Sequence, residues 1–207
     1  MKLSRLKSER PRREHDFYPT PYGLAKEALR RFSVDESMPE EWFSVLDAGC
    51  GEGIWMRASE EVFTNTHLSV YGVDLEPKCR ATTADFLGAP SSYLDYEYVH
   101  LVFGNPPYSL MEEFITHSLK SSILYPGGYV FFLGRLEFLA SKKRGLGLFK
   151  EYPPKRVYVL SRRPSFFSTN GRKTTDAQDY AMYLWKDGWK GDTKLDWLYW
   201  EYDEEQD

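Results

Sequence analysis

Hydrophobic residues in this chain gather in short continuous runs, separated by stretches in which they recur with helical spacing. Continuous apolar runs bounded by glycine, proline or charged residues predict buried strands. Four such runs lie at residues 44–48, 68–74, 99–104 and 129–133. Helical spacing predicts two helices, at residues 24–32 and 54–63. Strands that alternate with helices indicate an α/β domain with a largely parallel sheet.

The middle of the chain continues this alternation. A short strand is expected at residues 82–86. Ser109 is expected to cap a helix, because Glu112 three residues later completes a capping box, and this helix should end near residues 126–128. A further helix is expected over residues 137–148.

Two last apolar runs, at residues 156–160 and 180–185, predict a final pair of strands. The segment between them, residues 161–179, is polar, contains glycine and is too long for a tight hairpin. Loops of that length in compact domains are often functional, so we expect this one to contribute to a binding site.

Composition agrees with a single domain. The 207 residues, 42% of them hydrophobic, suit one α/β unit with a proper core. No apolar run is long enough to cross a bilayer, and residues 1–14 carry too much charge for a secretory signal. Cys50 and Cys79 form no disulfide framework and match no zinc spacing, so we expect a reducing, cytoplasmic setting and no metal.

Charge is distributed unevenly around a net value of −4. We expect a basic N-terminal arm at residues 1–15, a single domain at 16–200 and an acidic tail at 201–207. Two interpretations of the arm remain open: a solvated, disordered terminus, and an arm that contacts phosphates.

The strand at residues 99–104 leads directly into Asn105, Pro106, Pro107 and Tyr108. A rigid loop at the carboxyl end of a strand lies where α/β enzymes place their chemistry. An asparagine oxygen beside a free carbonyl can accept both hydrogens of one amino group, and a neighbouring aromatic ring can stack on a flat heterocycle. The tetrapeptide therefore suits an amine on a ring, such as N6 of adenine. Taken alone, it is equally well explained as a simple turn.

A second motif lies upstream, where the strand at 44–48 runs into Asp47, Gly49, Gly51 and Gly53. Glycines let a backbone turn sharply and approach a ligand closely. Neither the dinucleotide fingerprint nor the phosphate-binding P-loop is matched, so a ligand without a phosphate fits better. Asp47 could organise a bound amino group, or it could cap the following helix.

Acidic residues follow the next two predicted strands. Asp74 comes about 20 residues after the glycine loop, where an acid can accept hydrogen bonds from ribose hydroxyls. Asp85 and Phe86 could bind an exocyclic amine and cover the face of a ring, although loop aspartates are also ordinary turn formers.

Together, these motifs resemble those of S-adenosylmethionine-dependent methyltransferases of the Rossmann-like class I, and in particular the N6-adenine DNA methyltransferases. The matching segments, in gamma-type order, are residues 47–53, 72–74, 84–86 and 105–108. Residues 17–21 also resemble the segment that, in such enzymes, lies against the methionine end of the cofactor, which adds Tyr18 and Thr20 to the candidate cofactor-binding residues. The resemblance covers roughly residues 16–185.

The resemblance implies a mostly parallel seven-stranded sheet with an antiparallel last strand and helices on both faces. It also implies that S-adenosylmethionine lies across the carboxyl ends of the strands, with Asp74 on the ribose and Asp85 on the adenine amine. Asn105 and the Pro106 carbonyl would accept hydrogens from N6 of a target adenine in DNA, held by Tyr108. Such a base must be flipped out of a duplex or taken from a single strand.

Basic clusters later in the chain could contact nucleic-acid phosphates. The candidates are Lys142, Lys143, Arg144, Arg162, Arg163, Arg172 and Lys173. Residues 163–167 resemble an Arg-Pro-x-Phe segment of adenine methyltransferases, in which a phenylalanine, here preferably Phe167, would flank the base opposite Tyr108. Two rings so close to strand ends could equally belong to the core.

Other functions remain open at this point. They are adenine N6 methylation in RNA, glutamine N5 methylation of a protein, and a non-catalytic subunit that binds nucleic acid or a partner. DNA methyltransferases of gamma order usually carry a sizeable recognition domain after the Asn-Pro-Pro-Tyr segment, for which this sequence has little room. Target choice could therefore rest on residues 161–179, on the region of Lys142, on a second copy of the chain or on a partner subunit.

Overall fold

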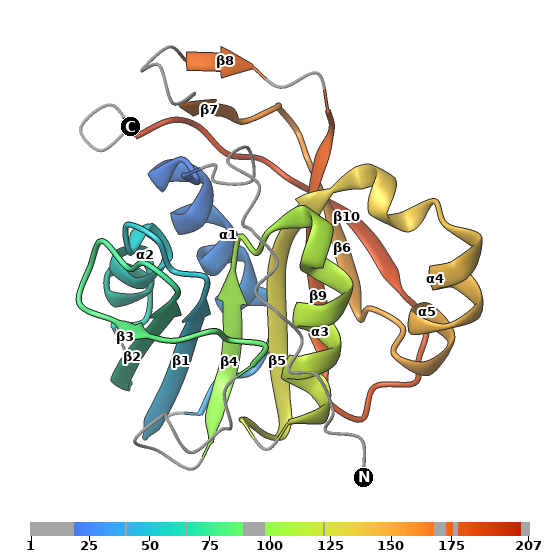
Figure 1. Ribbon diagram of the computed structural model, residues 1–207, viewed down its shortest axis with the longest axis horizontal. Helices are drawn as coiled ribbons and strands as arrows, with labels where there is room; N and C mark the ends of the chain where they lie inside the picture. Colours follow the sequence, from blue (N-terminus) through green and yellow to red (C-terminus); the bar gives the residue numbers. More distant parts are fainter. Residues whose placement is uncertain are drawn as a thin grey trace, which may run out of the picture.

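The computed structural model describes residues 19–39, 41–64, 66–88, 98–121, 123–167, 173–175 and 178–203 (Figure 1). The helices are α1 (Tyr22–Asp35), α2 (Ile54–Val62), α3 (Met111–Lys120), α4 (Lys142–Leu146) and α5 (Leu148–Glu151), with 3-10 turns η2 (Tyr108–Leu110) and η3 (Leu136–Leu139). The strands are β1 (Trp42–Ala48), β2 (His67–Asp74), β3 (Thr82–Thr83), β4 (Val99–Gly104), β5 (Leu124–Arg135), β6 (Arg156–Leu160), β7 (Ser165–Phe167), β8 (Lys173–Thr175), β9 (Tyr180–Lys186) and β10 (Lys194–Leu198).

Eight strands form the main sheet, in the order β10-β6-β9-β5-β4-β1-β2-β3. Strand β9 runs antiparallel to both of its neighbours, β5 and β6, and the other pairs are parallel. The sheet thus has one strand more than the seven expected, because β10 adds to the edge beside β6. The strand at residues 180–185, predicted to be the last and antiparallel one, is β9 and does run antiparallel; β10 follows it in the chain.

Helices cover both faces of the sheet, as predicted (Figure 1). On one face, the buried side of α1 packs with α2 against β1, β4, β5 and β9, and Leu29, Phe32 and Trp55 lie in this core. On the other face, α3 and α5 pack with η3 over the same strands, and Phe114, Ile115 and Leu148 lie in that second core. Two cores on one sheet leave its carboxyl edge for the site.

The predicted capping of a helix by Ser109 is wrong. Residues 108–110 form the 3-10 turn η2, in which the Leu110 N–H donates to the Pro107 carbonyl at 2.8 Å. Helix α3 starts only at Met111, with no side-chain cap. The proline loop therefore passes directly into the helix through a 3-10 turn, and this turn starts α3 in place of a side-chain cap.

Two other boundaries differ from prediction. Helix α3 ends at Lys120, and residues 126–128 lie inside β5, where a register shift between β4 and β5 accommodates the Pro-Gly-Gly sequence. The helix expected at 137–148 is divided into η3, α4 and α5, because Ser141 starts a new helix and Gly147 ends it.

The third strand and the long loop also differ in extent. Strand β3 comprises only Thr82 and Thr83. Within the loop at 161–179, strands β7 and β8 pair antiparallel as a separate two-stranded sheet. This hairpin follows the carboxyl end of β6 and precedes the start of antiparallel β9, so it stands at the carboxyl edge of the main sheet (Figure 1).

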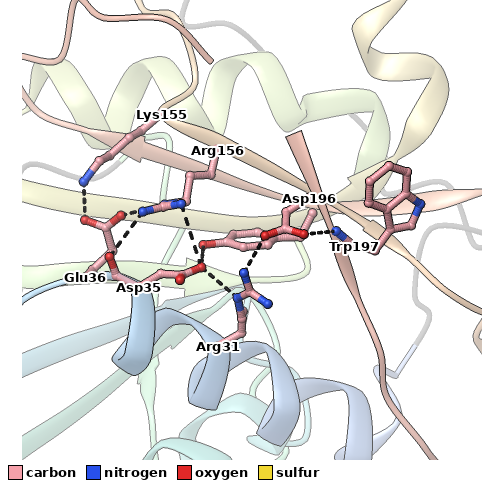
Figure 2. Close-up of polar contacts among 8 residues, drawn as sticks. Arg31, Asp35, Glu36, Lys155, Arg156, Asp196 and Trp197 are labelled. Atoms are coloured by element: carbon pink, nitrogen blue, oxygen red, sulfur yellow. Dashed lines mark hydrogen bonds and ion pairs between the residues drawn. The ribbon is translucent and has the colours of Figure 1, made fainter. Parts of the chain in front are cut away.

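At the opposite, amino edge, a cluster of charged side chains fixes the end of α1 to β6 and β10 (Figure 2). This charged cluster comprises Arg31, Asp35, Glu36, Lys155, Arg156 and Asp196. The Glu36 carboxylate, only 1% exposed, accepts hydrogen bonds from Lys155 and, at 3.0 Å, from the Arg156 Nε. A buried carboxylate with two cations is fully compensated.

The second carboxylate of the charged cluster is equally well partnered. Asp35 Oδ2 accepts hydrogen bonds from Arg31 Nε at 2.7 Å and from the Tyr158 hydroxyl at 2.8 Å. Burial by itself would raise the pKa of Asp35, but these hydrogen bonds outweigh it and lower the pKa below its usual value. Arg31 also bonds Asp196, so the network extends to the edge strand β10.

The segment after β10 returns across α1. A Cβ atom on Gly23 would lie only 2.0 Å from the Glu201 carbonyl oxygen. The returning backbone therefore contacts α1 at its glycine, where no side chain stands in the way. Glu201 pairs with Arg162, and the Tyr202 hydroxyl accepts from the Ser165 N–H at 2.6 Å. Residues 201–203 of the expected acidic tail therefore pack on the domain and hold the start of the 161–179 loop.

Candidate functional site

The glycine loop between β1 and α2 has the sharp geometry that its sequence predicts. Gly49, Gly51 and Gly53 have φ values of 82°, 50° and 75°, which side chains strongly disfavour. The N–H groups of Gly49 and Cys50 donate to the Val73 carbonyl at 2.8 and 3.1 Å. The loop is thus folded onto the carboxyl end of β2.

Asp74 lies at that end of β2 and is buried. Its carboxylate accepts hydrogen bonds from the Gly51 N–H at 3.0 Å and from the Glu76 N–H at 2.9 Å. These two bonds to backbone N–H groups fix the carboxylate against the glycine loop. The next side chain, Leu75, is 52% exposed and was not singled out from the sequence.

Asp47 is the least satisfied charged group in the described part of the chain. It is completely buried in β1, and none of the described residues donates a hydrogen bond to either carboxylate oxygen. Burial raises the pKa of Asp47 well above its usual range, and the charge of Asp74 adds to the effect. A buried carboxylate without partners fits a ligand that brings a cation or hydrogen-bond donors.

Gly104 lets the motif around Asp47 and the motif that begins at Asn105 lie close together, although no sequence motif marked it as a site residue. Its φ is 137°, and a Cβ atom there would lie 2.7 Å from Asp47 Oδ1. Strands β1 and β4 are parallel neighbours in which Asp47 pairs with Phe103. Asn105, two residues beyond Phe103, therefore emerges beside the buried carboxylate, and only glycine at position 104 permits this approach.

The proline loop after Asn105 is well ordered by its own geometry. Pro106 is buried, and in the described part of the chain no backbone N–H donates to its carbonyl. The Pro107 carbonyl instead accepts from Leu110 as the first bond of η2. The carbonyl predicted to accept an amine hydrogen, that of Pro106, is thus the one that the backbone leaves out of its own hydrogen bonds.

Tyr108 is half-buried and has two aromatic or cationic neighbours. Its ring centroid lies 5.6 Å from that of Tyr180, and the Arg135 guanidinium carbon lies 5.2 Å from it. Burial raises the pKa of the Tyr108 hydroxyl well above its usual value, and Tyr180 raises it further. Arg135, at the end of β5, is a further residue that sequence reasoning missed: a base that stacks on the same ring face must displace its guanidinium.

Thr20 lies beside the first turn of α2, which follows the glycine loop, and its contact with the cofactor stays a prediction. Its hydroxyl, which is buried, accepts a hydrogen bond at 3.1 Å from the indole N–H of Trp55. Trp55 is in the first turn of α2, two residues after Gly53. Tyr18 lies outside the described residues.

Asp85 and Phe86, adjacent in sequence, lie in different surroundings: Asp85 is exposed and Phe86 is buried. Asp85 is exposed, and its Oδ1 accepts the Leu87 N–H at 3.0 Å, which is the turn-forming role considered above. Phe86 is 3% exposed, with its ring centroid 5.0 Å from Phe114 and 4.8 Å from His117 on α3. Its expected role of covering a bound ring is not confirmed, because the ring is committed to the core.

The three basic residues of α4 also differ in exposure. Lys142 and Lys143 are exposed, and the Lys143 Nζ lies 3.5 Å from a Glu112 carboxylate oxygen. Arg144 turns inward: its Nε donates to the Phe138 carbonyl at 2.7 Å, and its guanidinium lies 4.4 Å from the Phe138 ring centroid. Because these hydrogen bonds hold η3 to α4, we expect Arg144 to stabilise the fold rather than to make the predicted phosphate contact.

The loop at 161–179 contains the other predicted substrate contacts. Phe167 is in β7 and Lys173 in β8, but their side chains, and all of Arg172, lie outside the description. Arg163 Nε pairs with Asp179 at 2.7 Å, which closes the base of the hairpin.

The described residues contain neither a candidate membrane span nor a candidate metal-binding cluster. None of the helices in the described ranges is both long and apolar enough to span a membrane. No group of three or more His, Cys, Asp or Glu side chains among the same residues could hold a metal ion.

Comparisons with known proteins identify the fold. No protein-family model matches the chain, and no curated protein matches it in sequence. Among solved structures, it is similar to a Pyrococcus horikoshii protein assigned as an RNA methyltransferase, with TM-score 0.61 and 16% identity over 89% of this chain and 93% of that one. It is also similar to an Agrobacterium tumefaciens protein assigned as an O-methyltransferase, with TM-score 0.54 and 15% identity over 86% and 85%.

A third similar structure is the methyltransferase subunit of a type I restriction-modification system from Streptococcus thermophilus. The TM-score is 0.62 at 16% identity, over 84% of this chain and 45% of that one, so this chain spans less than half of that subunit. At such identities the likeness concerns the fold. The predicted class I methyltransferase fold is confirmed, with β10 as an additional edge strand.

Proposed function

We propose that this protein transfers a methyl group from S-adenosylmethionine to the N6 amine of adenine in DNA. The observation that carries the proposal is the contact between two motifs at one sheet edge. The buried Asp47 carboxylate, without partners among the described residues, lies against Gly104, and Asn105 follows immediately. A donor site and an acceptor clamp within one crevice are what transfer between two bound molecules requires.

The residues of the glycine loop fit the cofactor. S-adenosylmethionine, when bound, supplies an electrophilic methyl group on a sulfonium, together with an ammonium group and ribose hydroxyls. Asp47 would accept hydrogen bonds from a ligand ammonium, which would compensate its buried charge. Asp74 would accept hydrogen bonds from the ribose hydroxyls beside the glycine loop that its carboxylate shapes. Exposed Leu75 would cover the adenine of the cofactor in place of Phe86.

The proline loop would hold the base. Asn105 Oδ1 and the Pro106 carbonyl would each accept one hydrogen of N6, which concentrates electron density on the nitrogen and aligns it. Tyr108 would stack on the base after Arg135 leaves the ring. Most of the rate gain would come from positioning, with an electrostatic contribution from the two acceptors as charge develops on N6.

A nucleic-acid acceptor is favoured over a protein by the flat-ring clamp and by the exposed lysines Lys142 and Lys143 on the face of α3 and α4. DNA is proposed because the motifs resemble those of the N6-adenine DNA methyltransferases. Two of the similar structures are assigned as an RNA methyltransferase and as a restriction-modification methyltransferase subunit, which agrees with a nucleic-acid acceptor. The proline-loop argument applies equally to adenine in RNA, and the assay below separates the two.

The test is incubation with tritium-labelled S-adenosylmethionine and duplex DNA, single-stranded DNA, RNA or protein. We expect label in DNA, recovered as N6-methyladenine after digestion. The Asn105→Ala variant should lose at least about 1,000-fold in turnover, since it removes an acceptor used in the transition state, while calorimetry shows wild-type cofactor binding. Label in protein alone, or full turnover by Asn105→Ala, would refute the proposal.

A further inference from the structure

Strand β10 presents an apolar stripe to solvent. Its even-numbered side chains Leu198 and, just beyond, Trp200 are buried in the core on the α1 face. The odd-numbered Leu195, Trp197 and Tyr199 are 52%, 50% and 73% exposed. Single exposed apolar residues are ordinary, but Leu195 and Trp197 on β10, with Tyr199 directly after it, alternate along the chain and form a continuous surface.

The backbone of β10 is also available on one side. Among the described strands, β10 has a neighbour only in β6. The Lys194 N–H donates to the Lys155 carbonyl, and the Leu198 carbonyl accepts from the Ser161 N–H, so the even residues turn their hydrogen-bonding groups toward β6. The N–H and C=O groups of the odd residues consequently point away from the sheet.

One of those outward groups has only a local partner. The Trp197 N–H donates to its neighbour Asp196 Oδ1 at 2.9 Å, a bond that a carbonyl from another strand can replace. An exposed edge strand with an apolar face is a template for strand addition.

We propose that β10 is the interface for a second copy of this chain, paired antiparallel about a two-fold axis at Leu195. Charge decides both the occupant and the register. With the axis at Leu195, Lys194 of each copy faces Asp196 of the other, and Leu195 faces Leu195. A shift of the axis to Asp196 would place two aspartates opposite each other, and a shift to Lys194 would place two lysines opposite each other. Of these three registers, only the one centred on Leu195 places opposite charges face to face.

This pairing joins two eight-stranded sheets into one continuous sheet. Because the two β10 strands run in opposite directions, the carboxyl edges of the two copies face opposite ways. Each glycine-loop crevice then works alone, so the interface does not depend on the proposed methyl transfer.

Cysteine cross-linking tests the register. Residues directly opposite in a hydrogen-bonded antiparallel pair have Cα atoms about 5.5 Å apart, within the range that a disulfide spans. The Leu195→Cys variant should therefore form a covalent dimer under mild oxidation. The Thr193→Cys variant should not, because its two sulfurs would be four residues apart along the strand, or about 13 Å. Wild-type protein, with Cys50 and Cys79 alone, is the baseline.

Light scattering tests the interface itself. We expect wild-type protein to have about twice the chain mass of 24.2 kDa, and Trp197→Glu to have the chain mass with an unchanged circular dichroism spectrum. Trp42→Glu is the matched control, because Trp42 is 44% exposed on β1, well separated from β10 in the sheet, and this variant should remain dimeric.

Three results would overturn the proposal. They are a wild-type chain that stays at 24.2 kDa at every concentration, a dimer unaffected by Trp197→Glu, and dissociation by Trp42→Glu to the same extent. Cross-linking of Thr193→Cys but not of Leu195→Cys would overturn the register.

Discussion

The two edges of the sheet treat buried carboxylates in opposite ways. At the amino edge, Glu36 and Asp35 each contact two or more donors within the charged cluster. At the carboxyl edge, Asp47 is just as deeply buried, yet none of the described residues donates a hydrogen bond to it. The pKa of Asp35 is lowered, whereas burial raises that of Asp47.

This difference separates charges that stabilise the fold from a charge kept for a ligand. A compensated carboxylate contributes to stability, and its loss leaves buried cations behind. An uncompensated one costs stability until something fills the crevice, which is typical of functional groups. Glu36 and Asp47 are both buried but differ in their surroundings. Glu36 lies between two cations, whereas Asp47 lies near the charge of Asp74 and has no donor among the described residues.

The largest effect is expected at the amino edge. Glu36→Gln should lower the free energy of unfolding by about 3–5 kcal/mol, because Lys155 and Arg156 lose a shared buried partner. Urea unfolding measures it. Glu27→Gln on the same helix is the control: Glu27 is 40% exposed, its partner Arg30 lies 3.6 Å away, and the change should stay below about 0.5 kcal/mol. Equal effects of the two variants would contradict the role of the charged cluster.

The next prediction makes the same substitution at both edges. Asp47→Asn should raise the Tm of the ligand-free protein by about 2–4 °C, the shift for roughly 1 kcal/mol in a chain of this size. Asp35→Asn should lower it, since Arg31 and Tyr158 lose a charged acceptor. Asp47→Asn should also weaken S-adenosylmethionine binding about 10- to 100-fold, the value of a charge-assisted hydrogen bond. Scanning calorimetry and titration calorimetry measure the two effects, and a drop in Tm with unchanged affinity would rule out a ligand role for Asp47.

Lowering the pH should remove the opposite contributions of Asp35 and Asp47 to the free energy of unfolding. Because the folded-state pKa of Asp35 is lowered, its contribution is present above the unfolded value of about 3.9 and is lost as pH falls through the folded-state pKa. The pKa of Asp47 is raised, so its cost is absent below about pH 3.9 and grows as pH rises toward the folded-state pKa. The stability difference of Asp47→Asn from wild type should therefore shrink between pH 7 and pH 4 in urea titrations, whereas that of Asp35→Asn should persist to about pH 4 and shrink only below it. A difference that stays constant with pH would show that protonation is not its source.

The smallest effect concerns the basic residues of α4. Lys142→Ala should make the slope of log K for DNA binding against log salt concentration shallower by about 1, the value of one lost phosphate contact. The stability of the protein should be unchanged. Arg144→Ala should instead lower the Tm and leave that salt dependence as in wild type, because its guanidinium is bonded within the fold. Fluorescence anisotropy over a series of salt concentrations distinguishes the two variants.

Sequence patterns predicted the regular part of the molecule well. The apolar runs at residues 44–48, 68–74 and 99–104 became β1, β2 and β4. Strands β1 and β4 are buried along most of their length and β2 at its carboxyl end, which leaves unbroken apolar runs in the sequence. The glycine spacing at 49, 51 and 53 predicted a loop that the φ values confirm. Strand β10 was missed, since its exposed Leu195 and Trp197 lie among charged residues and lack that continuity.

The site was predicted in its motifs but not in its contacts. Asp47 and Asn105 were singled out separately, and their closeness depends on Gly104 and on the pairing of β1 with β4. Arg135 and Leu75 had no motif, because their relevance comes from neighbours distant in sequence. Arg144 and Phe86 carried the expected chemistry, but tertiary packing directs both inward.

The β7–β8 hairpin has a practical consequence for engineering. Strands β6 and β9 pair directly from Val157–Tyr183 to Val159–Ala181, and this ladder does not involve the hairpin that connects them. The two ends of the 161–179 loop are fixed, since the Ser161 N–H donates to the Leu198 carbonyl and the Asp179 carbonyl accepts from the Leu136 N–H. A segment of similar span from another protein could be grafted between those ends. Such chimaeras would test whether this segment sets the target of the proposed methyl transfer while the glycine loop and proline loop stay in place.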